Sequence, residues 1–260
     1  MMKQKVALKL AYFGLHFHGY ARQPTVDTIE DQIVSKLVEK QIISDLKGAK
    51  IRCASRTDKH VSAVANVMTF YTLKTPRTVL SLLADEFESI FPYGISTVPD
   101  DFNPRYALKR TYHYLLPSER FPIEQLRIAL SLFQGNHDFS NFARIEPHRN
   151  PIRTIDSIHI NQHEGFLIVE VSAQTFLWNQ IRRMMEASIK YCKEKISLDQ
   201  IKQALDEPET PVDLNIAPAS PLILTRIDYP KITFFEDERL KKKKDVVTSM
   251  VKQHITHLDF

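Results

Sequence analysis

The segment Ala54–Ala63 carries one carboxylate between two cations. Its sequence is ASRTDKHVSA, in which Asp58 lies between Arg56 and Lys59. Neighbouring positive charges favour the ionised carboxylate and lower its pKa. An ionised Asp suits a nucleophile or an electrostatic stabiliser, whereas a general acid needs the opposite shift of its pKa. The same pattern is also typical of a surface turn with ion pairs, so the loop by itself leaves both interpretations open.

Two further side chains have types that fit such chemistry. Tyr112 alternates with polar residues in a strand-like segment, where a tyrosine stacks on a base, moves a proton, or fills half-buried core. Arg182 and Arg183 are neighbours on an expected helix, so their side chains point in different directions. An inward-pointing arginine needs a carboxylate partner, because burying an unpaired charge is costly. Asp58 is the candidate partner.

Basic and aromatic residues are interleaved in several loops of the chain. Such a mixture binds phosphates and stacks unpaired bases, although scattered surface charge produces the same pattern. The basic residues are Arg105, Lys109, Arg110, Arg144, His148, Arg149 and Arg153, and the aromatic residues are Phe102, Tyr106, Tyr112, Phe139 and Phe142. From this set we take Arg105 and Arg149 as candidate substrate-binding residues.

Composition argues against several other classes of protein. The chain has 260 residues, a formal net charge of +4 and 6 glycines, and these glycines are not spaced as in a dinucleotide-binding or Walker A loop. We therefore expect no nucleotide cofactor. No apolar run approaches the length of a membrane span, so no membrane association is expected.

Cysteine and histidine spacing gives no metal or disulfide pattern. Cys53 and Cys192 are far apart in sequence, which fits a reducing compartment and predicts a cytoplasmic location. The pair His16 and His18 has no nearby carboxylate in a known ligand spacing, and the same holds for the other histidine pairs. We expect no metal site and no other cofactor.

Hydrophobic periodicity predicts an alternation of strands and helices. Strands are expected near residues 6–12, 64–72, 95–98, 110–116, 154–161, 166–173 and 222–229, with the fifth and sixth forming a hairpin. Helices are expected from residue 27 or 28, over 77–88, over 123–133, near 175–192 and from residue 197. Thr28 with Asp31 and Ser197 with Gln200 resemble capping pairs, and Thr75 followed by Pro76 is typical of a helix start. Residues 136–151 are expected to form a loop. A terminal amphipathic helix is expected after the lysine run at residues 241–244.

This order predicts an α+β protein with two similar halves. We expect an N-terminal half over residues 1–105 that carries the Asp58 loop, a C-terminal half over residues 106–230, and a polar, basic tail with a short helix over residues 231–260.

Several motifs in sequence order are similar to those of the TruA-type tRNA pseudouridine synthases. The loop Ala54–Ala63 resembles the family's AGRTDxGV motif, and residues 12–24 resemble its first loop. Residues 99–114, 135–142, 176–182 and 217–224 resemble its later motifs. The resemblance extends from about residue 6 to residue 230 and leaves out the tail.

The resemblance implies a fold, an activity and roles for particular residues. Asp58 matches the catalytic aspartate, Tyr112 the tyrosine that stacks on the target base, and Arg182 the arginine that pairs with the aspartate. Arg56 matches a position along the RNA path and Leu222 an apolar residue of the pocket. The implied fold is two pseudo-symmetric ferredoxin-like halves with antiparallel sheets joined across a basic cleft. The implied activity is isomerisation of uridine to pseudouridine in the anticodon arm of tRNA, near positions 38 to 40, by a homodimer without a cofactor.

The sequence departs from the family pattern at three places. Ser55 and His60 replace usual glycines in the aspartate loop, and Pro221 replaces the glycine before Leu222. A residue other than glycine is strained where the backbone needs a positive φ. Two other functions remain open: a catalytically silent RNA-binding protein that uses the same cleft, and a metal-dependent hydrolase built on the histidine pairs.

Overall fold

The computed structural model describes residues 3–260, and the chain forms two compact units. The first unit contains the residues up to Leu108 together with Ile223–Gln253, and the second contains Lys109–Leu222 and His254–Phe260. The chain therefore passes between the units three times. Each unit combines helices with a mostly antiparallel sheet, as the sequence predicts.

The sheet of the first unit has the strand order β10-β4-β1-β3-β9, and β2 pairs with β3 in addition. β1 is antiparallel to both β3 and β4, whereas β3 and β9 pair in parallel through Ser62 with Ile223 and Ala63 with Leu224. The strands are β1 (Gln4–Tyr12), β2 (Arg52–Cys53), β3 (Ser62–Thr72), β4 (Ile90–Thr97), β9 (Leu222–Asp228) and β10 (Phe235–Glu236).

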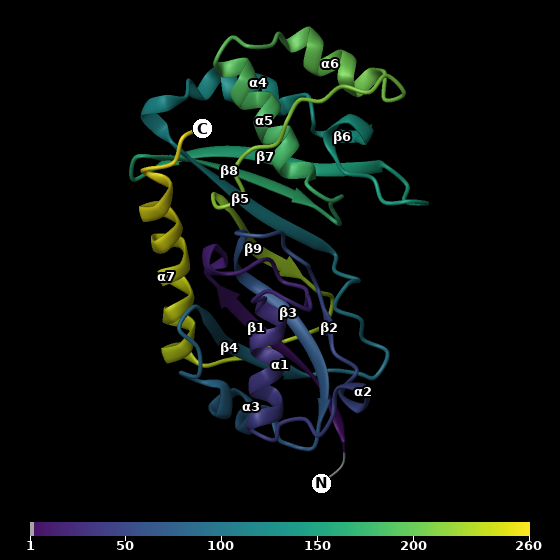
Figure 1. Ribbon diagram of the computed structural model, residues 1–260, viewed down its shortest axis with the longest axis vertical. Coiled ribbons are helices and arrows are strands. Elements are labelled where there is room, and N and C mark those ends of the chain that lie inside the picture. The colour runs from purple at the N-terminus through teal and green to yellow at the C-terminus, as the bar shows by residue number, and fades with distance from the viewer. Residues whose placement is uncertain (1–2) are drawn as a thin grey trace. The chain divides into compact units, whose positions relative to one another are not determined.

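Side-chain caps fix where the helices of this unit begin. Thr28 accepts a hydrogen bond from the backbone N–H of Asp31 at 3.3 Å, and Thr75 caps the next long helix in the same way, with Pro76 at its first turn. Both caps confirm the sequence prediction. The helices are α1 (Ile29–Glu39), α2 (Leu46–Ala49), α3 (Pro76–Leu83) and α7 (Glu238–Ile255), with a 3-10 turn η1 (Gly14–His16) (Figure 1).

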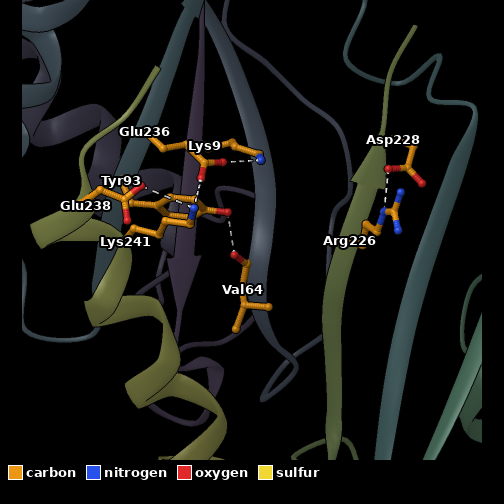
Figure 2. Close-up of polar contacts among 8 residues, drawn as sticks. All are labelled: Lys9, Val64, Tyr93, Arg226, Asp228, Glu236, Glu238 and Lys241. Carbon is orange, nitrogen blue, oxygen red and sulfur yellow. Dashed lines mark hydrogen bonds and ion pairs between the residues drawn. The ribbon is translucent and has the colours of Figure 1, made fainter. Parts of the chain in front are cut away.

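A group of polar contacts holds the segment before α7 on the first unit's sheet (Figure 2). Glu236 accepts a hydrogen bond from Lys9 of β1 at 2.8 Å, and its second oxygen lies 3.0 Å from the ammonium group of Lys241 on α7. The buried Tyr93 of β4 donates its hydroxyl to the backbone oxygen of Val64 at 2.9 Å. One carboxylate therefore links a central strand to the helix that follows β10.

The sheet of the second unit has the order β5-β8-β7-β6, and every pairing in it is antiparallel. Its strands are β5 (Lys109–Pro117), β6 (Gly135–Asp138), β7 (Ile152–His163) and β8 (Phe166–Ala173). β7 and β8 form the expected hairpin. Helix α4 (Ile123–Ser131) packs against α5 (Gln180–Cys192) and β7 (Figure 1). Helix α6 (Leu198–Asp206) begins with a capping box of Ser197 and Gln200, as expected.

Several boundaries differ from the sequence prediction: β4 begins at Ile90 and not near residue 95, and α7 begins at Glu238 and includes the lysine run that was expected to precede it. Residues 135–138, which adjoin and overlap the expected loop, form β6, because backbone pairing with β7 outweighs their weak strand pattern. Helix α5 begins at Gln180 and not near residue 175, because Asn179 has a left-handed backbone with a φ of 64°. Helix α3 ends at Leu83 because Ala84 is already extended. Among the described residues, no helix is long and apolar enough to cross a membrane.

Candidate active site

The loop that carries Asp58 is anchored from two sides by tyrosines. The hydroxyl groups of Tyr12, at the end of β1, and Thr57 are hydrogen bonded at 2.8 Å. The backbone N–H of Tyr20 donates to the carbonyl oxygen of Thr57 at 3.0 Å. Thr57 and both tyrosines are buried, so the residue directly before Asp58 has little freedom to move.

Two glycines let the preceding loop approach this segment closely. A Cβ atom on Gly14 would lie 2.1 Å from the carbonyl oxygen of Val61, which is impossible without moving the backbone. Gly19 has a φ of +101°, and a Cβ there would lie 3.3 Å from the carbonyl oxygen of Thr57. Gly14 and Gly19 therefore allow residues 14–20 to pack directly against the Asp58 loop.

Asn66 of β3 supports the beginning of the loop. Its amide group donates to the carbonyl oxygen of Ser55 at 2.8 Å and to the hydroxyl of Tyr12 at 3.1 Å, and its oxygen accepts from the backbone N–H of Ser55 at 3.3 Å. Asn66 and Tyr12 are positioning residues that the sequence analysis did not find. The sequence signal for Asn66 is an amide side chain in a strand otherwise made of small, β-branched and apolar residues.

The two residues that replace usual glycines in the loop, Ser55 and His60, differ in backbone conformation. Ser55 does not have a positive φ, so serine fits its backbone there without strain. His60 has a φ of 69°, the left-handed region that favours glycine. The strain expected from the sequence is therefore located at His60 alone.

Asp58 itself is half-buried, and its backbone oxygen accepts a hydrogen bond from the N–H of Val61 at 3.1 Å. Arg56 is exposed, and so is Arg105, beyond β4. Burial raises the pKa of the neighbouring Cys53 thiol to about 11, and the positive charges of Arg56 and Arg105 oppose this shift. Both arginines thus lie within electrostatic reach of one thiol, which places two predicted substrate-binding residues in one neighbourhood of the first unit.

In the second unit, Tyr112 lies on β5 with its ring against another aromatic ring. The centroids of Tyr112 and Phe176 are 5.3 Å apart and the rings are nearly perpendicular, an edge-to-face contact. Tyr112 is only half-buried, whereas Tyr114, two residues further, is buried and donates to the carbonyl oxygen of Pro218 at 3.0 Å. Tyr112 is therefore the less buried of the two tyrosines of this strand.

Arg182 is held at the start of α5 by the segment before β9. Its Nε donates to the carbonyl oxygen of Ala217 at 2.8 Å, and the backbone N–H of Ala217 donates to the carbonyl oxygen of Arg182 at 3.2 Å. Nη1 of Arg183 instead lies 3.4 Å from Oδ1 of Asp213. The two neighbouring arginines therefore have different partners, and the ion pair of Arg182 with Asp58 stays a prediction.

The remaining predicted site residues are Leu222 and Arg149, both in the second unit. Leu222 is buried, and its N–H donates to the carbonyl oxygen of Ala219 at 3.0 Å, a tight turn in which Pro221 is accommodated. Arg149 is exposed, and its Nε lies 3.4 Å from Oε2 of Glu146. Within residues 3–260, no group of three His, Cys, Asp or Glu side chains is arranged to hold a metal ion.

Comparison with known proteins identifies the family. A family described as tRNA pseudouridine synthase matches residues 129–230. The chain is 37% identical to tRNA pseudouridine synthase A of Thermococcus kodakarensis over 241 residues, which is 92% of this chain and 90% of that protein. It is 34% identical to the protein of the same name from Methanosphaera stadtmanae over 263 residues, 98% of this chain and 94% of that one.

Similarity to solved structures is weaker. A crystal structure of a Cbf5-Nop10-Gar1 complex matches with a TM-score of 0.37 and 15% identity, over 84% of this chain and 48% of that chain. The sequence relationship, in contrast, covers nearly the whole chain at more than a third identity. This chain belongs to the tRNA pseudouridine synthase family, whose members are isomerases.

Proposed function

We propose that this protein isomerises uridine to pseudouridine in the anticodon arm of tRNA, near positions 38 to 40, with Asp58, Tyr112 and Arg182 as its catalytic residues. The observation that carries the proposal is the Asp58 loop, which is anchored by Thr57, Tyr12 and Asn66. A surface turn would not need a buried hydrogen-bond network behind the residues that lead to its carboxylate.

The reaction breaks the bond between N1 and C1′ and forms one between C5 and C1′. C5 loses a proton and N1 gains one, so atoms balance and no oxidant or cofactor is consumed. Asp58 starts the cleavage by one of three routes: attack at C1′, attack at C6, or removal of the 2′ proton. Arg182 keeps Asp58 ionised and directed, because an opposite charge favours the charged carboxylate.

The freed uracil must rotate without escaping. We assign this task to the half-buried ring of Tyr112, which stacks on the base and takes the C5 proton, and to the apolar side chain of Leu222. Arg56, Arg105 and Arg149 bind the RNA backbone, which offsets the few kcal/mol, roughly, of unstacking the target base. Two pseudo-symmetric ferredoxin-like halves that join their sheets across a basic cleft would provide this arrangement.

The catalytic role of Asp58 is tested with Asp58→Asn and Asp58→Ala. Tritium release from tRNA labelled at C5 of uridine should fall by about a thousandfold or more, because the group that opens the glycosidic bond is lost. The affinity for tRNA should stay within about twofold of the wild type. Asp245→Asn, the same charge change at an exposed position of α7, should leave both values unchanged.

Two outcomes would contradict the proposal. Full tritium release by Asp58→Ala would remove Asp58 from the mechanism. No pseudouridine from the wild type with any tRNA would favour a silent RNA-binding protein. Transcripts in which positions 38 to 40 are cytidine test the target, and they should not react.

We also propose that the enzyme acts as a homodimer in the cytoplasm. Light scattering of the purified protein should give twice the 30.1 kDa mass of the chain.

A further inference from the structure

A small pocket in the second unit is lined mainly by arginines and aromatic side chains. Its volume is about 60 Å³, and it lies between the loop at residues 144–153 and the segment at residues 175–178. Its charged lining residues are Arg144, Arg149, Arg153 and Glu146, three positive charges against one negative charge. The pocket therefore favours an anion.

Arg153 is fixed in place but incompletely hydrogen bonded. Its Nη1 donates to the carbonyl oxygens of Asn150 at 2.8 Å and Ile152 at 2.6 Å. Its Nε is buried and has no partner among the described residues. Burial and the neighbouring charge of Arg149 lower the pKa of Arg153. A bound anion would relieve this repulsion, because two neighbouring positive charges are stabilised by a negative charge placed between them.

Beside these cations, Trp178 offers an aromatic face. The guanidinium of Arg144 lies 4.1 Å from the centroid of the Trp178 ring, and the backbone N–H of Arg144 donates to the carbonyl oxygen of Trp178 at 2.8 Å. Trp178 is nevertheless 43% exposed. An exposed indole next to arginines is the arrangement that stacks an unpaired base while its phosphate is bound.

The pocket is also connected to a proposed catalytic residue within the same unit. Phe176 lines the pocket and packs edge-to-face against Tyr112. A phosphate in the pocket would therefore be separated from Tyr112 by a single side chain. This places the pocket on the path of a nucleic acid whose target base stacks on Tyr112.

We propose that this pocket binds one phosphodiester of single-stranded RNA, with Arg149 and Arg153 on the phosphate and Trp178 stacked on an adjacent base. The inference rests on the proposed function in that the RNA is the tRNA substrate. A peptide rich in carboxylates is the other class of polyanion that the charge would attract. RNA is favoured because only a base uses the exposed indole face.

Trp178 is the only tryptophan in the chain, so its fluorescence reports this pocket directly. Titration with an oligocytidylate, which contains no uridine and cannot react, should quench the fluorescence. Arg149→Gln and Arg153→Gln should each weaken this binding roughly tenfold, the effect of one lost charged hydrogen bond. Each should also reduce the slope of log affinity against log salt by about 0.7, the value for one phosphate contact on a single strand.

Arg127→Gln is the matched control, because Arg127 is an exposed arginine of the same unit that lies on α4 outside this pocket. It should bind the oligonucleotide like the wild type. With tRNA as substrate, Arg149→Gln should raise KM and leave kcat unchanged. If Arg153→Gln lowers the melting temperature, the result for Arg149→Gln alone tests the proposal. Arg149 is 59% exposed, so its loss does not disturb the core.

The proposal is overturned if neither arginine variant changes the titration, or if polyglutamate changes the fluorescence as strongly as oligocytidylate does. Because the probe holds no uridine, this result is independent of catalysis. Failure of the Asp58 experiment would leave the titration interpretable, and failure of the titration would leave the Asp58 assignment intact.

Discussion

At the scale of single residues, hydrogen bonds behind the Asp58 loop distinguish two buried tyrosines. The Tyr12 hydroxyl is hydrogen bonded with Thr57 and accepts from Asn66. The Tyr20 hydroxyl is buried without a partner among the described residues, and burial raises its pKa well above the usual value. The same Tyr→Phe change therefore has opposite consequences at the two positions.

We expect Tyr12→Phe to destabilise the protein by about 1–3 kcal/mol, because it leaves buried partners unsatisfied. It should also reduce the rate of pseudouridine formation, since Thr57 precedes Asp58. Tyr20→Phe removes a hydroxyl that has no partner and should leave stability unchanged or slightly raised. Urea denaturation and the tritium-release assay measure both effects. Equal losses for the two variants would contradict the assigned network.

At the scale of elements, Glu236 joins β10, β1 and α7. Burial acts to raise its pKa, but hydrogen bonds from Lys9 and Lys241 outweigh burial and hold the pKa below its ordinary value. A carboxylate with a depressed pKa stabilises the folded state at pH values above the unfolded pKa, about 4.3. This stabilisation is lost as the pH falls through the lower folded pKa.

Glu236→Gln should therefore lower the melting temperature at pH 7 by about 2–4 °C, the shift that 1 kcal/mol gives in a protein of this size. The difference from the wild type should shrink as the pH falls through the folded-state pKa of Glu236, because the wild-type carboxyl then also becomes neutral. Glu238→Gln is the control, because Glu238 is 78% exposed and lies 3.6 Å from Lys241. A difference in melting temperature that does not shrink as the pH falls would assign the effect to packing and not to charge.

The comparison of sequence with structure is also clearest for elements. Local signals predicted the caps at Thr28, Thr75 and Ser197 and the hairpin of β7 and β8, because these depend on residues close together in sequence. The predicted start of α5 was wrong because the left-handed backbone of Asn179 leaves no hydrophobic signal in the sequence. β6 was missed because its pairing with β7 is a tertiary contact.

For the candidate site too, local motifs were predicted from the sequence and contacts between distant elements were not. The motifs identified Asp58 and the glycines of the first loop, and the structure supplies the reason for Gly14: its Cβ would meet the Val61 carbonyl. The support from Asn66 and the pocket around Arg153 were not predicted. Both depend on side chains that approach from elements distant in sequence.

At the scale of the whole molecule, the end of the described chain returns to the second unit. Arg120 donates to the carbonyl oxygens of Leu258 at 2.7 Å and Thr256 at 3.2 Å. The buried Phe121 meets the ring of Phe260 edge-to-face at 5.9 Å. Residues 254–260 therefore cover part of the second unit's core.

Phe260→Ala should cost about 1–2 kcal/mol of unfolding free energy, because it removes a half-buried ring and an aromatic pair. Val246→Ala, at a position of α7 that is 48% exposed, should change stability by less than about 0.5 kcal/mol. Guanidinium denaturation compares the two variants. A neutral Phe260→Ala would show that these residues do not contribute to the core.

The parallel pairing of β3 with β9 has a consequence for synthesis on the ribosome. Ser62 and Ala63, the last residues of the Asp58 loop, pair with Ile223 and Leu224, which are translated about 160 residues later. During elongation, this edge of the nascent sheet stays unpaired while residues 109–222 of the second unit are synthesised. The aspartate loop thus acquires its final support only near the end of translation.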